Sequence, residues 1–169
     1  MDKLEIRRST MLDAKSIQRL MNEPSVHAFY GIAPYSSQRE WQLYIERANE
    51  HGFHIFTAEV SGSFRGISVI SVRKDLLTSH TVSLSIAVLP EFSGMGIGRK
   101  MLEAAITFSF NWLNVRRIEL EVVCSNDRAI GLYASCGFMT EGVKRQALFC
   151  DGDYCDVYMM SLLRDNFIC

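Results

Sequence analysis

Hydrophobic and polar residues alternate along much of this chain with a period of two, the pattern of strands that bury one face. Between these stretches, apolar residues recur every three or four positions, which favours amphipathic helices. Strands are predicted over residues 4–8, 53–60, 64–72, 80–89, 116–124, 138–149 and 154–163, and helices over residues 14–21, 37–51, 100–112 and 126–136. This order predicts an α/β (α+β) fold, a mixed sheet of about seven strands flanked by about four helices.

Polar residues mark the boundaries of several of these elements. Asp13 is a plausible N-cap for the first helix, and Ser37 with Glu40 forms a capping box before the second. The Asp151-Gly152 pair predicts the turn of the last hairpin. Residues 22–36 contain two prolines and three aromatic residues and are predicted to form a loop.

The strand predicted over residues 80–89 has two different faces. Large apolar side chains share one face and small ones share the other: Val82, Leu84, Ile86 and Val88 against Ser83, Ser85 and Ala87. The small face could leave room for a ligand. Close packing against a helix explains the same pattern equally well.

Three glycines, Gly94, Gly96 and Gly98, follow this strand and open the next helix. Such a loop can hold an anion, because its backbone N–H groups lack partners and the helix dipole favours negative charge. No Lys-Ser/Thr pair follows, and the glycine spacing differs from Gly-x-Gly-x-x-Gly, so two nucleotide-binding motifs do not fit. An ordinary glycine-rich turn before a helix remains the alternative.

Composition excludes several classes of protein. Of the 169 residues, 48% are hydrophobic and 22% are charged, and the net charge is −1, so the chain has the composition of one globular domain without a nucleic-acid footprint. No apolar run is long enough to span a membrane, and the first residues lack the apolar region of a signal peptide. Five cysteines, an odd number, favour reduced thiols in the cytoplasm, and the histidines show no metal-ligand spacing.

Two motifs resemble the GNAT superfamily of N-acetyltransferases. The family's acyl-CoA loop, Arg/Gln-x-x-Gly-x-Gly/Ala, falls on residues 93–98, with Ser93 as a departure from Arg or Gln. The family pattern Asn-x-x-Ala-Ile-x-Leu-Tyr-x-x-x-Gly-Phe matches residues 126–138 at every specified position. The resemblance covers nearly the whole chain, residues 1–169 as a single domain. With Asn111-Trp112-Leu113 and the C-terminal part, it is most similar to bacterial amino-acid and small-amine N-acyltransferases.

The resemblance implies a mostly antiparallel sheet that splays between the fourth and fifth strands, with acetyl-CoA in the resulting V. Its pantetheine arm would pair with the backbone of Ile86, Ala87 and Val88. Asn126 would cap a helix and contact that arm, with helix capping alone as the alternative. The pyrophosphate would lie on a continuous segment of the loop: Ser93, Gly94, Met95, Gly96, Ile97, Gly98 and Arg99. No metal is implied.

The resemblance also implies direct attack of an amine on the thioester, so the cysteines need no catalytic role. Tyr133 matches the family's general acid, although a core aromatic residue would fit the same helix face. Many relatives place an acid where this chain has Ser83, so His80, Glu121 or a chain of water molecules is left as the candidate base. Residues 26–35 are expected to bind the acceptor, and Phe29, Tyr30 and Ser83 are the candidate substrate-binding residues. The aromatic residues of this segment suggest an apolar or aromatic amine, although packing explains them equally well.

The sequence therefore predicts an N-acetyltransferase that acts on the primary amine of a small molecule or an amino acid. Two alternatives remain. The same fold could acetylate a protein N-terminus or a lysine, and the missing acid at Ser83 permits a non-catalytic acyl-CoA-binding module. A homodimer in the cytoplasm is expected, with neither a nucleic-acid nor a membrane partner.

Overall fold

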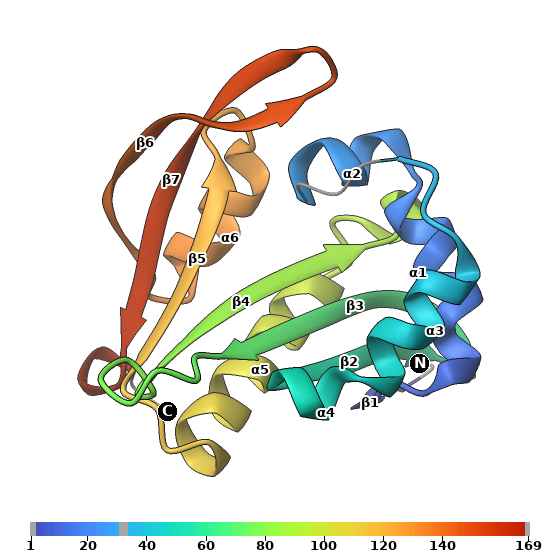
Figure 1. Cartoon of the computed structure of the whole chain (residues 1–169), viewed down its shortest axis with the longest axis horizontal. Coiled ribbons are helices and arrows are strands. Elements are labelled where there is room, and N and C mark those ends of the chain that lie inside the picture. The colour runs from blue at the N-terminus through green and yellow to red at the C-terminus, as the bar shows by residue number, and fades with distance from the viewer. Residues whose placement is uncertain (1–2, 31–33, 168–169) are drawn as a thin grey trace.

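A computed structural model describes residues 3–30 and 34–167 of the chain and contains one seven-stranded sheet, as predicted (Figure 1). The strands lie in the order β1-β2-β3-β4-β5-β7-β6. Their bounds are β1 Leu4–Arg8, β2 Phe53–Val60, β3 Ser63–Val72, β4 Thr81–Val88, β5 Arg117–Val123, β6 Met139–Cys150 and β7 Asp153–Leu163. Neighbours are antiparallel except β4 and β5, which are parallel, so the predicted mixed and mostly antiparallel sheet is confirmed.

The described residues contain six α-helices instead of the predicted four or so. These are α1 Ala14–Met21, α2 Pro24–Tyr30, α3 Gln38–Glu46, α4 Ala48–His51, α5 Ile97–Trp112 and α6 Asp127–Ser135, with short 3-10 turns η1 Met11–Asp13, η2 Pro90–Phe92 and η3 Arg164–Asn166. The predicted second helix is divided at Arg47 into α3 and α4.

The prediction of a loop over residues 22–36 is wrong for Pro24–Tyr30, which forms α2. Proline suits the first turn of a helix, where its missing N–H would have no partner in any case. Val26 is buried in the core beside α1, so tertiary packing stabilises a short helix that its own sequence does not specify. Residues 31–33 of the predicted loop lie outside the described residues.

Helices cover both faces of the sheet. On one face, α5 packs on β3 and β4, and its Leu102 and Ile106 belong to the same core cluster as Val82 and Leu84. On the other face, Ala87 belongs to a second cluster with Ile17, Val26 and Trp41 of α1 to α3. The large and small faces of β4 therefore meet different helices, as the alternation predicts.

The sheet opens between β4 and β5. These strands pair only at Thr81–Arg117, Val82–Ile118 and Ser83–Glu119 and then diverge (Figure 1). Arg117 stabilises the closed end of the V, with its Nε 3.2 Å from a carboxylate oxygen of Glu119 and its Nη1 2.7 Å from one of Glu141. The predicted splay is confirmed.

The four cysteines that the structure describes, Cys124, Cys136, Cys150 and Cys155, have free thiols. In the β6–β7 ladder Cys150 lies opposite Asp153, while Cys155 lies opposite Leu148. Within the described ranges, no group of three His, Cys, Asp or Glu side chains is arranged to hold a metal ion. Across the same residues, no helix is both long and apolar enough to cross a membrane.

Candidate active site

A cavity of about 690 Å³ fills the V between β4 and β5. One side is the open edge of β4, and the other is formed by β5 and α6. The loop before α5 closes one end, and α2 lies across the small face of β4. Twelve of the residues predicted from the sequence line it: Phe29, Tyr30, Ile86, Ala87, Val88, Ser93, Gly94, Gly96, Gly98, Arg99, Asn126 and Tyr133. The fold therefore gathers one cluster from segments that are far apart in the chain.

Three predicted residues do not line the cavity. Met95 is 69% exposed, and Ile97 is buried with Met101 in a core cluster. Ser83 lies at the closed end of the V, paired with Glu119. Ser85, two positions further along the same face of β4, lines the cavity in its place.

The loop at the mouth of the V has the backbone of an anion site. Gly94 and Gly96 have φ values of 83° and 80°, in the left-handed region that favours glycine. Gly96 is the N-cap of α5, so the first N–H groups of this helix lack carbonyl partners within it. Gly96, Gly98 and Arg99 line the cavity at this point. These N–H groups and the dipole of a long helix favour a phosphate at this position.

Arg128 adds positive charge to this end of the cavity. It lines the cavity, and its Nη2 is 3.6 Å from the position that a Cβ on Gly94 would occupy. The nearby Arg99 is held by α6, where its Nη2 donates to Ser135 Oγ at 2.7 Å. Sequence reasoning missed Arg128, because it occupies a variable position of its motif and only the fold brings it to the loop.

The position of Tyr133 is compatible with both interpretations that the sequence left open. Its ring packs in the main core, 5.8 Å from the ring of Phe138, and only 7% of the residue is exposed. It also lines the cavity. Burial raises the pKa of Tyr133 to about 12, so its phenol keeps its proton at neutral pH. A buried, protonated hydroxyl is suited to donate a proton into the V.

The other half of the cavity is lined by α2 and by one carboxylate. The hydroxyl oxygens of Tyr30 and Ser85 lie 2.7 Å apart. Of the two side chains weighed as a base, Glu121 lines the cavity and forms an ion pair with Lys144 of β6. His80 is exposed before β4, at the closed end of the V, where its carbonyl accepts from the N–H of Arg116 at 2.8 Å. The geometry thus favours Glu121 as the base.

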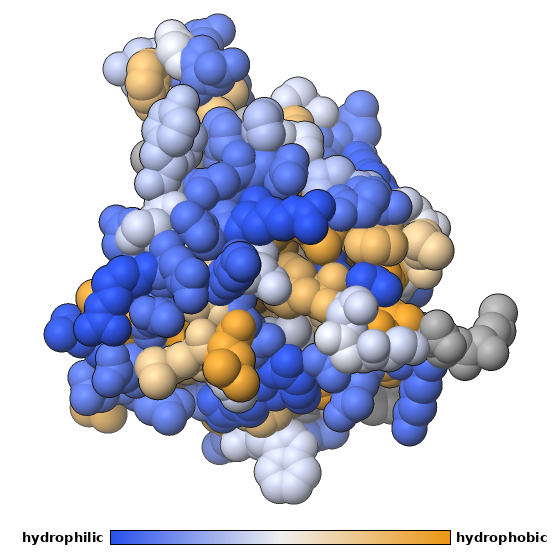
Figure 2. Space-filling view, turned by 90° about the vertical axis from the view of Figure 1, so that its right-hand side faces the viewer, coloured by the Kyte–Doolittle hydropathy of each residue, from blue (hydrophilic) through white to orange (hydrophobic). Residues whose placement is uncertain are grey.

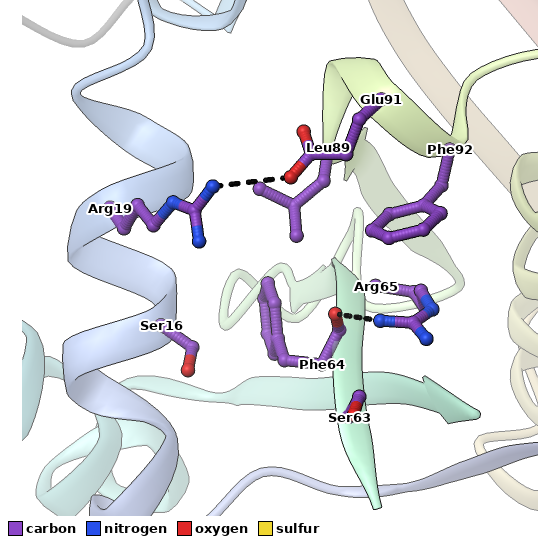
Figure 3. Close-up of a pocket in the computed structure, with 8 residues that line it drawn as sticks. All are labelled: Ser16, Arg19, Ser63, Phe64, Arg65, Leu89, Glu91 and Phe92. Atoms are coloured by element: carbon purple, nitrogen blue, oxygen red, sulfur yellow. Dashed lines mark hydrogen bonds and ion pairs between the residues drawn. The ribbon is translucent and has the colours of Figure 1, made fainter. Parts of the chain in front are cut away.

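A second, smaller hollow of about 350 Å³ lies between α1, the start of β3 and η2 (Figure 3). The Arg65 guanidinium lies 4.0 Å from the centre of the Phe92 ring, and Arg19 forms an ion pair with Glu91 at 3.2 Å. Phe92 lines both hollows and directly precedes the glycine loop. Its contact with Arg65 therefore stabilises the segment from which the loop starts. The surface on the side of α1 to α3 is mostly hydrophilic, with apolar side chains showing between the charged ones (Figure 2).

Residues 15–138 match the model of the Acetyltransferase (GNAT) family. The match covers well over half of the chain and includes the glycine loop, Glu121 and Tyr133. The chain therefore belongs to the acetyltransferase (GNAT) family, as the two sequence motifs predict.

Three characterised relatives are similar over most of their length. Spermidine N(1)-acetyltransferase of Vibrio cholerae is 27% identical over 157 residues, 92% of this chain and 90% of that protein. The L-amino acid N-acetyltransferase of Escherichia coli is 28% identical over 164 residues, 97% of this chain and 100% of that protein. An N-alpha-acetyltransferase of Sulfurisphaera tokodaii is 32% identical over 131 residues, 72% of this chain and 75% of that protein.

Solved structures agree with this assignment. The crystal structure of the Vibrio cholerae spermidine N-acetyltransferase in complex with CoA and spermine has a TM-score of 0.87 to this chain, at 27% identity and 96% coverage of both chains. The protein is an acetyl-CoA-dependent N-acetyltransferase, and acetyl-CoA is its co-substrate. The roles of the individual cavity residues stay predictions.

Proposed function

We propose that this enzyme transfers the acetyl group of acetyl-CoA to the primary amine of a small molecule or an amino acid. One observation carries the proposal: the V brings an anion-binding loop, a protonated phenol and a carboxylate into one cavity. The names of the Vibrio cholerae and Escherichia coli relatives, a spermidine and an L-amino acid acetyltransferase, support small acceptors. The name of the Sulfurisphaera tokodaii relative, an N-alpha-acetyltransferase, supports keeping a protein N-terminus as an alternative acceptor.

The residues of β4 and α5 would hold acetyl-CoA. Beyond Ser83, β4 pairs with no other strand on the β5 side among the described residues. The N–H and C=O groups of Ile86 and Val88 face that side and would pair with the amides of the pantetheine arm, whereas those of Ala87, predicted with them, face Ile67 of β3. The N–H groups of the loop would donate hydrogen bonds to the pyrophosphate oxygens, with Arg128 and Arg99 supplying positive charge. Asn126 Oδ1 caps α6 by accepting from the Ala129 N–H at 3.2 Å, and its position in the lining supports a contact with the arm.

The reaction then needs two proton transfers. The amine nitrogen attacks the thioester carbonyl carbon while its proton passes to the Glu121 carboxylate, directly or through one water molecule. The C–S bond breaks, and the Tyr133 hydroxyl donates its proton to the departing thiolate. A C–N bond replaces the C–S bond, and no residue of the enzyme is acetylated. This direct route explains how the cysteines can lie outside the chemistry.

The proposal is tested with purified enzyme, acetyl-CoA and a panel of amines, amino acids and N-terminal peptides, with CoA release followed by a thiol reagent and products by mass spectrometry. We expect transfer to small primary amines and little transfer to peptides. Peptide acetylation at much higher kcat/KM would favour the alternative acceptor. Tight CoA binding without transfer to any amine would identify a non-catalytic module.

We also propose that residues 1–169 form one domain, which the single continuous sheet supports, and that the enzyme is a homodimer in the cytoplasm. Strand β6 lies at a sheet edge and exposes Val143 and Phe149, which supports pairing with a second copy. Light scattering coupled to size exclusion tests the dimer, and a monomer at micromolar concentration would contradict it. The near-zero net charge supports the absence of nucleic-acid and membrane partners.

A further inference from the structure

We infer that the acceptor is an α-amino acid with an apolar side chain, and that Lys144 and Glu121 together bind its carboxylate and its ammonium group. This inference rests on the proposed function. It names the acceptor class and adds Lys144, which neither sequence motif contains, as a residue that determines specificity.

The ion pair between Glu121 and Lys144 links β5 to β6 at the edge of the cavity. Glu121 belongs to β5 and lines the V, and Lys144 of β6 reaches it across β7. Both side chains are about half exposed, 47% for Lys144 and 53% for Glu121. An ion pair with this exposure is weak, so a ligand of suitable charge can displace either partner at little cost.

The charges along the cavity separate possible acceptors. Among the described lining residues, Glu121 supplies the one carboxylate, while Arg99 and Arg128 lie at the phosphate end. A polyamine carries several ammonium groups and needs several acidic partners to replace their hydration. One carboxylate beside a lysine cannot provide them. It suits a ligand with one ammonium group and one anionic group.

An α-amino acid has this arrangement. A single carbon separates its ammonium group from its carboxylate, so the two charges are about as far apart as the two partners of an ion pair. Laid head to tail against Glu121 and Lys144, it replaces one ion pair with two. The side chain would then extend over Val26 and Phe29 of α2, which supply apolar surface.

The same exchange prepares Glu121 for proton transfer. While Lys144 holds the carboxylate of Glu121, an incoming amine must compete with it. An acceptor carboxylate draws Lys144 away and leaves Glu121 facing the substrate ammonium group. Glu121 takes one proton from the ammonium group and releases it to water, and it takes the second proton as the neutral nitrogen attacks the thioester. Tyr133 protonates the thiolate as proposed above. An amine without a carboxylate lacks this help.

The test compares amino acids with the amines that lack only the carboxylate: L-phenylalanine with 2-phenylethylamine, and L-leucine with 3-methylbutylamine. The variant is Lys144→Met, and the matched control is Lys15→Met, at an exposed lysine on α1. For the wild type we expect a higher kcat/KM for each amino acid than for its amine. In Lys144→Met, kcat/KM for the amino acids should fall by roughly 10- to 100-fold, the range for losing one charge-assisted contact, while the amines keep or gain activity.

Two measurements keep the result interpretable. Lys15→Met should retain the wild-type preference, and thermal melts with calorimetric acetyl-CoA binding should show Lys144→Met folded and loaded normally. An equal loss for amino acids and amines, or a wild-type preference for spermidine over both amino acids, would overturn the inference while the proposed function stands. Failure to acetylate any amine overturns the proposed function and this inference with it.

Discussion

The hydroxyl oxygens of Tyr30 and Ser85 lie 2.7 Å apart, and this hydrogen bond joins the end of α2 to the middle of β4. Burial raises the pKa of the Tyr30 phenol above its usual value, so the phenol stays protonated at neutral pH. Both side chains line the cavity. The bond therefore links α2 to β4 in the half of the cavity that is predicted to bind the acceptor.

Replacing Tyr30 with Phe tests this relationship. The ring remains and the hydroxyl is lost, so the free energy of unfolding should fall by about 1 kcal/mol. The KM for the acceptor should rise several-fold, while the KM for acetyl-CoA changes much less. Tyr44→Phe is the matched control, because Tyr44 packs on Trp41 and Phe53 outside the cavity. An acceptor KM that is unchanged in Tyr30→Phe would show that the bond serves folding alone.

Gly96→Glu tests the anion site. The substitution puts a carboxylate at the N-terminus of α5, where the pyrophosphate should bind, so calorimetry should show a loss of CoA affinity of at least 100-fold. Gly62→Glu controls for backbone strain, because Gly62 also has a positive φ, 73° against 80°, and also has open space around it. A folded Gly96→Glu protein that binds CoA normally would refute the site.

Gly66→Ala tests the role of the β4 backbone. A Cβ on Gly66 would lie 2.5 Å from the carbonyl oxygen of Ala87 and 3.1 Å from the Cα of Val88. Strand β4 must therefore move at the segment proposed to hold the pantetheine arm. We expect a loss of about 1–3 kcal/mol in the free energy of unfolding and a several-fold weaker acetyl-CoA affinity. Gly142→Ala in β6 is the control, since nothing lies within 4 Å of its Cβ. Unchanged acetyl-CoA affinity with a normal melt would count against the predicted backbone contact.

Local signals in the sequence predict most of the fold. Alternation finds the seven strands, and the Ser37–Glu40 capping box forms as predicted, with the Glu40 N–H donating to Ser37 Oγ at 3.2 Å. Helix α2 is missed because Val26 and Tyr30 stabilise it through contacts with α1 and β4. Such tertiary contacts leave no periodic signal in a seven-residue segment.

The residues of the candidate site also divide into those that a local sequence motif indicates and those that only the tertiary structure brings together. The loop glycines and Tyr133 lie in contiguous motifs, so the sequence can indicate them. Arg128 and Lys144 acquire their positions only when α6 reaches the loop and β6 pairs with β7, so no local pattern marks them. Asp13 shows the same limit. It occupies the N-cap position of α1 as predicted, but its carboxylate makes no capping hydrogen bond to that helix. The carboxylate accepts instead from Arg7 and from the Thr10 N–H.

Those contacts of Asp13 predict how stability depends on pH. Both Asp13 oxygens lie 2.9 Å from Arg7 nitrogens, and the Thr10 N–H donates at 2.7 Å. Burial alone would raise the pKa of Asp13, but these hydrogen bonds outweigh it and hold the pKa below its usual value. The folded state therefore binds this proton less readily than the unfolded chain. The contribution is present above the unfolded pKa, about 3.9, and is lost as pH falls through the lower folded value.

Asp13→Asn should lower the free energy of unfolding at pH 7 by about 2 kcal/mol, as expected for losing charge-assisted hydrogen bonds from a buried carboxylate. Denaturant melts between pH 7 and pH 2.5 should also show a shallower decline below pH 4 than in the wild type. Asp75→Asn, in an exposed turn, should change neither quantity. An Asp13→Asn protein with wild-type stability at pH 7 would show that Arg7 and Asp13 contribute no net stability.

The chemical role of Tyr133 is tested by Tyr133→Phe. If the hydroxyl protonates the leaving thiolate, kcat should fall by roughly 10²-fold, within the usual range for a positioned acid. The KM for acetyl-CoA should move much less, because the phosphate contacts lie at the loop, and this combination marks an interaction made mainly in the transition state. The wild-type kcat should not decline through ionisation of this phenol between pH 8 and pH 10, since burial raises the pKa of Tyr133 to about 12 and the proton-bearing form is the active one. Stopped-assay rates and a thermal melt on the same preparation decide between the two roles, because a stable and fully active Tyr133→Phe enzyme would make Tyr133 a core aromatic residue and nothing more.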